Sequence, residues 1–256
     1  MFNLPYINAL ISQYNSATID RSLSPNETMN NQWYFDIGKY AIDSVLMACF
    51  ASGATKVSSV LDLPCGHGRV LRHLVAMFQG ARFHACDLDH DGVDFCVRTF
   101  GARPVISQPD LTKVDFGTTF DLIWVGSLFT HTSRELTRQW MTHLASFLSP
   151  SGIIVATVHG RWSEHVYLQH QYITEDKWKR ILQGYRETGY GYADYSTEEN
   201  HSYITGSYGV SLAKPHAILQ DIETIPDVRI YSYHERGWGE HQDVVVFGRP
   251  SYAMPW

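Results

Sequence analysis

The sequence predicts an α/β fold built on a doubly wound, seven-stranded sheet that is mostly parallel and has an antiparallel last strand. Three observations support this. Short apolar runs alternate with helix-length amphipathic segments over residues 57–159, the pattern of parallel βαβ units with right-handed crossovers. A glycine-rich turn joins the first apolar run to the helix that follows it. The two final strands, 228–235 and 243–247, are joined by a connection that is too short for a crossover, so they pair antiparallel.

The individual elements follow from hydrophobic periodicity. Strands are expected, besides the final pair, at residues 57–63, 82–87, 103–107, 120–125 and 153–159. Helices are expected at residues 30–50, 69–78, 91–100, 132–148 and 215–223. The fourth of these helices opens on a capping-box match, in which Thr132 is followed three residues later by Glu135. The turn Ser149-Pro-Ser-Gly152 should separate this helix from the strand that begins at Ile153.

We expect one domain over residues 1–256, with four parts in chain order. They are an N-terminal helical cap (1–55), a ligand-binding core (56–159), an aromatic-rich insertion (160–212) and a C-terminal helix with a strand pair (213–256). The insertion breaks the alternation of strands and helices and contains Tyr185, Tyr190, Tyr192, Tyr195, Tyr203 and Tyr208. It is either a lid over a bound acceptor or a packed accessory layer, and the sequence leaves both possibilities open.

Composition and charge exclude several classes of protein. The chain has 256 residues, of which 44% are hydrophobic and 18% charged, and its formal net charge is −6. No basic run is present, which argues against a nucleic-acid partner. The four cysteines form no Cys-x-x-Cys pair, as is usual for reduced thiols in the cytoplasm. No signal peptide is visible and no run approaches the ~20 apolar residues of a membrane span. We expect a cytoplasmic protein that acts on small molecules without membrane insertion; its oligomeric state is not predicted.

The strongest motif lies between the first strand and its helix. Asp62 is followed by a turn that contains Gly66 and Gly68, and Asp87 ends the next strand. Glycines let the backbone approach a ligand, and an acid at the second position can bind ribose hydroxyls. The alternative to a ligand-binding turn is a tight turn between strand and helix that binds nothing. The third glycine of a dinucleotide fingerprint is replaced by Leu71. A pyrophosphate would meet Asp62 as a like charge, whereas the cationic amino-acid end of S-adenosylmethionine would not.

At these positions the sequence resembles the class I S-adenosylmethionine-dependent methyltransferases, a Rossmann-like family. The resemblance covers residues 57–159, and the final strands in pattern only. It is carried by Val60-Leu-Asp-Leu-Pro-Cys-Gly-His-Gly-Arg69, His84-Ala-Cys-Asp87 and Phe120-Asp-Leu-Ile-Trp124, with Pro64 where a small residue is usual. The resemblance implies S-adenosylmethionine as cofactor, bound by Asp62, Pro64, Cys65, Gly66, Gly68, Asp87, Leu88, Asp110, Leu111 and Ser127. Asp87 would hold the ribose and Leu88 the adenine, while Asp110 either reaches the adenine amino group or is only a turn residue.

Three histidines are expected at the ligand-binding edge of the sheet, because ligands bind at the carboxyl ends of parallel strands. His131 follows the fourth strand, His159 the fifth, and His241 precedes the antiparallel last strand. A hydroxyl acceptor gains from a base of near-neutral pKa, so these three are the candidate catalytic residues. Any one of these histidines could instead have a structural role. Methyl transfer can also proceed without a base, because correct positioning of the two reactants lowers the barrier. A divalent cation at this edge is the minor alternative, and we expect no metal.

The sequence therefore predicts a methyltransferase that acts on a small polar acceptor. The acidic charge balance and the aromatic insertion favour O-methylation of a sugar or a related metabolite. Two alternatives stay open, an NAD(P)-dependent oxidoreductase and a non-catalytic S-adenosylmethionine-binding module.

Overall fold

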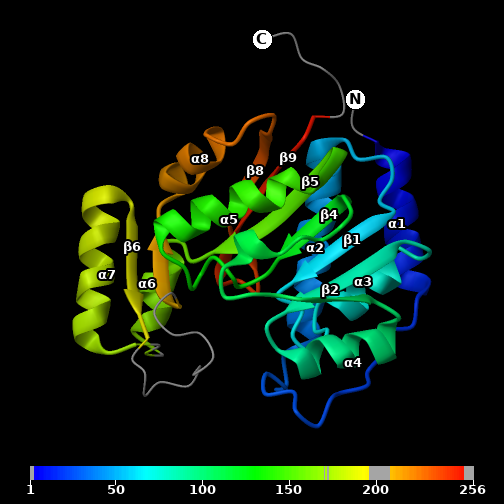
Figure 1. The fold of residues 1–256 in the computed structure, drawn as a ribbon, viewed down its shortest axis with the longest axis horizontal. Coiled ribbons are helices and arrows are strands. Elements are labelled where there is room, and N and C mark those ends of the chain that lie inside the picture. The colour runs from blue at the N-terminus through cyan, green and yellow to red at the C-terminus, as the bar shows by residue number, and fades with distance from the viewer. Residues whose placement is uncertain (1–2, 170, 172, 196–207, 251–256) are drawn as a thin grey trace.

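The computed structural model describes residues 3–169, 171, 173–195 and 208–250. Its centre is a seven-stranded sheet with the strand order β3-β2-β1-β4-β5-β9-β8 (Figure 1). The strands are β1 (Ser59–Leu63), β2 (Arg82–Asp87), β3 (Arg103–Ile106), β4 (Phe120–Val125), β5 (Leu148–Val158), β8 (Arg229–Trp238) and β9 (Gln242–Gly248). Strands β1 to β5 pair in parallel, whereas β9 is antiparallel to both β5 and β8. The predicted fold class is confirmed.

Both faces of this sheet are buried, which explains why its strands appear in the sequence as unbroken apolar runs. Val60 and Trp124 belong to one hydrophobic cluster, and Leu61 and Ile123 to another. The first cluster is completed by α1 (Leu4–Ser16), α2 (Tyr34–Ser52), α3 (Leu71–Met77) and α4 (His90–Phe100). The second is completed by α5 (Arg134–Ser146) and α8 (Pro215–Glu223). By the alternation of side chains along a strand, Asp62 points to the face of α1 to α4.

One predicted boundary is wrong. The turn expected at Ser149-Pro-Ser-Gly152 lies inside β5, which begins at Leu148. Phe120 of β4 pairs with Leu148 and Leu122 pairs with Ile153, so the register shifts between these two pairs. The turn residues are accommodated as a bulge, and the local proline and glycine signal does not end the strand.

The insertion forms one end of the molecule, at the left in Figure 1. It contains α6 (Trp162–Tyr167), α7 (Glu175–Thr188) and a separate antiparallel pair, β6 (Tyr190–Asp194) and β7 (Gly209–Ala213). It has a small core of its own, in which the rings of Tyr167 and Trp178 stack with centroids 3.9 Å apart. The described part is therefore a packed layer, while Tyr203 lies outside the described residues.

Strand β7 joins this layer to the main sheet through its backbone. The amide of Gly209 donates to the carbonyl of His131 at 2.9 Å, and that of Ser211 to the carbonyl of Thr130 at 2.9 Å. The amide of Ala213 donates to the carbonyl of His159 at 2.8 Å. The insertion is thus hydrogen-bonded to the loops that follow β4 and β5, where two of the three candidate histidines, His131 and His159, lie.

Arg72 of α3 connects the N-terminal cap to the glycine-rich turn. Its side chain is 2% exposed. The guanidinium donates to the carbonyl oxygens of Gly68 (2.9 Å), His67 (3.2 Å), Asp20 (2.8 Å) and Ser22 (2.9 Å). The N–H donors of a guanidinium lie in one plane and point in different directions, so one side chain can donate to all four carbonyl oxygens. The sequence periodicity gave no sign of this role.

We expect Arg72→Lys to destabilise the protein by about 3 kcal/mol, because an ammonium cannot satisfy the same carbonyl groups and leaves them buried without a donor. The melting temperature should fall by roughly 6–12 °C, measured by circular dichroism. Arg82→Lys, at an exposed position in β2, is the matched control and should melt like the wild type. Equal melting temperatures for the two variants would show that the Arg72 contacts contribute little.

Candidate functional site

The glycine-rich turn after β1 has two glycines with different roles. Gly66 has a φ of 47° and Gly68 a φ of 75°, a region that favours glycine. A Cβ on Gly68 would lie 2.4 Å from the Phe100 ring of α4, so this glycine allows close packing. A Cβ on Gly66 would meet no described atom within 4 Å. Gly66 therefore borders open space, as a backbone that receives a ligand must.

Asp87 is held at the end of β2 by the same turn. One of its carboxylate oxygens accepts from the amide of Gly66 at 2.8 Å, and the other from the amide of Asp89 at 3.0 Å. Burial raises the pKa of this carboxyl above its ordinary value. Each oxygen retains a further acceptor position, so Asp87 can still bind the hydroxyl groups of a ligand.

Asp62 is the least satisfied acid of the site. Its side chain is 1% exposed, and within the described residues neither carboxylate oxygen has a donor in good hydrogen-bond geometry, although the backbone amide of Leu71 is near enough to act to lower its pKa. Burial, reinforced by the nearby charge of Asp87, raises its pKa well above the ordinary value. A buried polar group without a partner calls for an explanation. The ammonium group of S-adenosylmethionine would supply donors and a compensating charge, so the residues present fit this cofactor.

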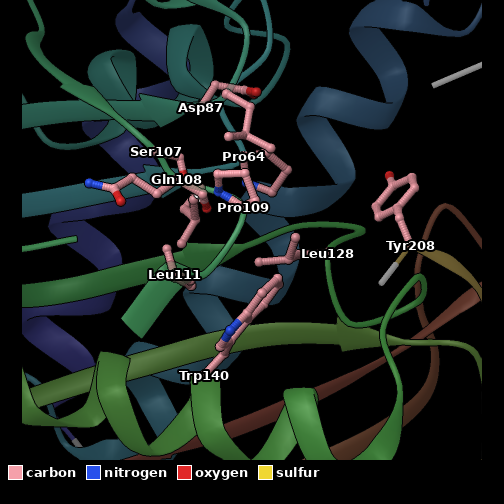
Figure 2. A pocket seen from close by; sticks show the side chains of 11 residues that line it. Pro64, Asp87, Ser107, Gln108, Pro109, Leu111, Leu128, Trp140 and Tyr208 are labelled. Atoms are coloured by element: carbon pink, nitrogen blue, oxygen red, sulfur yellow. Dashed lines mark hydrogen bonds between the residues drawn. The ribbon is translucent and has the colours of Figure 1, made fainter. Parts of the chain in front are cut away.

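A cavity of about 190 Å³ lies beside the turn (Figure 2). Figure 2 shows Asp87 at one end, Trp140 at the other and Tyr208 across from Leu128. The complete lining is Leu63, Pro64, Asp87, Leu88, Ser107, Gln108, Pro109, Leu111, Leu128, Trp140 and Tyr208. A mostly apolar wall with one acid at its end suits a nucleoside. Sequence reasoning missed Ser107, Gln108 and Trp140, which lie outside the motifs.

Of the ten expected cofactor residues, Pro64, Asp87, Leu88 and Leu111 line this cavity, whereas six lie outside the lining: Asp62, Cys65, Gly66, Gly68, Asp110 and Ser127. The carboxylate of Asp110 accepts from the amide and the hydroxyl of Thr112, at 3.1 and 2.6 Å, and so caps a short 3₁₀ turn. This is the turn role that the sequence left open for it. The amide of Cys65 donates to the carbonyl of Cys86 at 3.0 Å, and its thiol is buried.

Ser127 follows β4 in a left-handed conformation, with a φ of 58°. Its amide donates to the hydroxyl oxygen of Thr157 at 2.7 Å, and its own hydroxyl oxygen accepts from the side-chain amide of Gln242 at 3.0 Å. Thr157 in turn donates to the carbonyl oxygen of Gln242 at 2.6 Å. This closed ring of hydrogen bonds fixes the start of the loop between β4 and α5. No sequence signal pointed to Thr157 or Gln242, which belong to separate strands.

His131 lies at the border of the cavity. Its ring stacks on Tyr208, a lining residue, with centroids 4.6 Å apart. Its Nδ1 lies 2.7 Å from the carbonyl oxygen of Gly209. Because a carbonyl only accepts, Nδ1 carries a proton, so in the neutral ring the lone pair lies on Nε2. In this tautomer the imidazole can accept a proton at Nε2.

The other two histidines continue from His131 as a row of rings. His159 lies 6.2 Å from His131 and stacks on His241 at 5.2 Å, between ring centroids. Its Nδ1 lies 3.1 Å from the carbonyl oxygen of Ser211, and His241 lies 3.2 Å from the hydroxyl of Ser163. Burial, then the charges of the two neighbouring rings, lowers the pKa of His159 well below its ordinary value, and burial lowers that of His241. The structure thus brings all three candidates together.

The sequence matches a known family over the binding core. Residues 60–152 match the family model described as a methyltransferase domain. The core of this chain is therefore a methyltransferase domain. The match covers the turn, β1 to β4 and the start of β5, and it favours the methyltransferase over the oxidoreductase alternative. No curated protein matches the chain.

Solved structures share the fold of this methyltransferase at low sequence identity. A S-adenosylmethionine-dependent methyltransferase from Clostridium acetobutylicum ATCC 824 is 12% identical with a TM-score of 0.55, over 84% of this chain and 92% of its own. The PH0226 protein from Pyrococcus horikoshii OT3 is 14% identical with a TM-score of 0.58, over 87% and 93%. An O-methyltransferase family protein from Burkholderia thailandensis is 13% identical with a TM-score of 0.55, over 86% and 59%.

Across the described ranges, no three His, Cys, Asp or Glu side chains are arranged so that they could hold a metal ion. Among the helices of the same ranges, none has the length and apolar character to cross a bilayer.

The two glycines of the turn should respond differently to a methyl group. Gly68→Ala should destabilise the methyltransferase by about 3 kcal/mol, since backbone strain adds to overpacking against Phe100. Gly66→Ala should cost about 1 kcal/mol, from the positive φ alone. Urea unfolding followed by fluorescence measures both. Equal losses would contradict the assignment of Gly68 to packing and Gly66 to the ligand side.

Proposed function

We propose that this methyltransferase methylates a hydroxyl group of a small polar acceptor, a sugar or a related metabolite, with His131 as the general base. The observation that carries the proposal is the stacking of His131 on Tyr208, which also lines the cavity assigned here to the cofactor. The base thereby borders the proposed cofactor cavity, where it can take the proton of an acceptor hydroxyl that is aligned with the methyl group and the sulfur.

The cofactor is proposed to bind along the turn and the cavity. Asp62 takes the ammonium group and Asp87 the ribose hydroxyls, while Pro64, Leu88 and Leu111 enclose the adenine. Gly66, Gly68 and the backbone at Cys65 allow the close approach, and Ser127 and Asp110 border the site without lining the cavity. When bound, S-adenosylmethionine supplies an electrophilic methyl group on its sulfonium.

The protein's part in the reaction is to orient the acceptor and remove its proton. The acceptor hydroxyl would donate to Nε2 of His131, which takes the proton as the oxygen attacks the methyl carbon. The bond from Nδ1 to the Gly209 carbonyl keeps the ring in the required tautomer. His159 and His241, whose pKa values are lowered by burial, are the second candidates for the base.

An aromatic wall beside the base supports a sugar acceptor. The rings of Tyr195 and Tyr208 lie 6.0 and 4.6 Å from the ring of His131, between centroids. Such faces, which end in hydroxyl groups, suit the alternating apolar and polar surfaces of a carbohydrate. Transfer to oxygen agrees with the Burkholderia neighbour, described as an O-methyltransferase family protein. The net charge of −6 favours a small acceptor over nucleic acid, and four buried free cysteines agree with a cytoplasmic location.

The first experiment is calorimetric titration of the purified protein with S-adenosylhomocysteine, with NAD as the control ligand. Binding of the first alone supports the cofactor site. A panel of sugars, nucleotide sugars and phenols is then tested for transfer of a labelled methyl group. Product formed only with amine acceptors would overturn the assignment to oxygen.

Replacement of the base should lower turnover without loss of cofactor binding. We expect His131→Gln to lower kcat on the order of 100-fold or more, with the Kd for S-adenosylhomocysteine within about threefold of wild type. His241→Gln, which changes the far end of the same row, is the matched control and should lose less. If single variants at His131, His159 and His241 all kept full activity, none of these histidines would be the base. The positioning of the acceptor next to the cofactor would then be the whole mechanism.

Cofactor affinity should rise with pH over the range in which Asp62 ionises. The free protein holds this carboxyl at a raised pKa, and a bound ammonium group stabilises the ionised form, so binding releases a proton. Calorimetry over a series of pH values above the ordinary pKa of an aspartate, in buffers of different ionisation enthalpy, measures this release. Asp62→Asn should weaken binding on the order of 10-fold and abolish the release. If Asp62→Asn released the same number of protons on binding, a group other than Asp62 would be the source of the proton.

A further inference from the structure

A second hollow lies beside the edge strand β3, apart from the cavity assigned above to the cofactor. It is a groove of about 470 Å³, and of the described residues the two linings share only Gln108. Its polar lining includes His84 of β2, Arg103 of β3 and Lys113. His84 precedes Asp87 by three residues in the same strand, which places it roughly 10 Å nearer the amino end. The proposed methyl transfer uses none of these three side chains.

The register of the sheet brings three basic side chains together on one face. Arg103 pairs directly with His84, and neighbouring strands lie about 4.8 Å apart. Arg82 precedes His84 by two residues in β2, so its side chain points to the same face. Cys86, the next residue in this series, belongs to the cluster completed by α5 and α8, which identifies the face. Two arginines therefore flank one histidine.

His84 is a buried polar group at the wall of this groove. It is 4% exposed, and its ring packs edge-on against Phe120 with centroids 5.1 Å apart. Within the described residues its Nδ1 has no partner in good hydrogen-bond geometry, although the carbonyl of Val60 is near enough to act to raise its pKa. Burial and the charges of Arg103 and Arg82 outweigh that effect and lower the pKa. An anion in the groove would favour the protonated ring, which has one N–H donor for the carbonyl and one for the ligand.

The arginines of this cluster have no partner for their charge. Neither the Arg82 nor the Arg103 guanidinium forms an ion pair or a hydrogen bond with any part of the chain that the structure describes. Lys113 lies 3.6 Å from a carboxylate oxygen of Asp110, and Asp115 is the one acid among the described residues of the lining. The groove is therefore cationic in a chain whose net charge is −6, and such a groove attracts anions.

We propose that the groove beside β3 binds a small phosphorylated molecule, with the phosphate on Arg103, Lys113 and His84. A guanidinium binds phosphate through two parallel hydrogen bonds, and the ammonium of a lysine adds a point charge. The groove is larger than one phosphate needs, and Val114 and Phe116 give it an apolar wall for the rest of the ligand. This site is separate from the proposed methyl-transfer site and does not rest on it.

Phenyl phosphate is the probe, and inorganic phosphate and phenol test its two halves. By calorimetry on the full chain, wild type should bind phenyl phosphate on the order of 10-fold more tightly than inorganic phosphate, because the ring is buried against the apolar wall. Phenol should not bind at the same concentrations. Arg103→Gln should weaken the binding of both phosphates on the order of 10-fold. Arg98→Gln, at an exposed position of α4 outside the lining, is the matched control and should keep the wild-type Kd.

Two further measurements locate the bound phosphate. Addition of phenyl phosphate should shift the imidazole NMR signals of His84, which are assigned by their absence in His84→Gln. Saturating S-adenosylhomocysteine should leave the Kd for phenyl phosphate unchanged, whereas competition would place the phosphate in the cofactor cavity and overturn the proposal. Absence of binding to wild type would also overturn it, and so would equal affinities of Arg103→Gln and Arg98→Gln. Arg103 is exposed, so its variant keeps the test decisive even if His84→Gln does not fold.

Discussion

The binding site depends on the hydrogen bonds of one buried cation, Arg72. Its guanidinium gathers carbonyl groups from the glycine-rich turn and from the N-terminal segment around Asp20 and Ser22. A buried charge is tolerated only where its donors are satisfied, so these segments must be in place together. The cap is for this reason part of the turn's structure.

A second constraint comes from the insertion. Its strand β7 binds the loops after β4 and β5 through amide groups, and its carbonyls at Gly209 and Ser211 accept from the imidazoles of His131 and His159. The same stretch of backbone therefore positions two rings and selects their tautomers. Although the insertion breaks the alternating pattern of the core, it forms one side of the site and not merely its cover.

The sequence allowed the core to be predicted because each of its strands is buried on both faces, a pattern that is local and strong. It misplaced the start of β5 because Pro150 and Gly152 are local turn signals, whereas the bulge that absorbs them depends on pairing with β4. Asp62 and Asp87 could be proposed from the sequence because they belong to a motif with regular spacing. Thr157, Gln242 and Arg72 were not found, because the chain brings them to the site only through its topology.

The two halves of the site meet at Tyr208, which lines the cavity on one side and stacks on His131 on the other. Leu128 lines the same cavity from the loop that carries His131, and the ring of Ser127, Thr157 and Gln242 fixes where that loop starts. In the proposed assignment, the cofactor side and the acceptor side are therefore one surface built on a rigid loop. A fold that serves many chemistries varies its loops and insertions while its sheet is kept. On this proposal the insertion sets the acceptor, because it supplies the aromatic wall and holds His131.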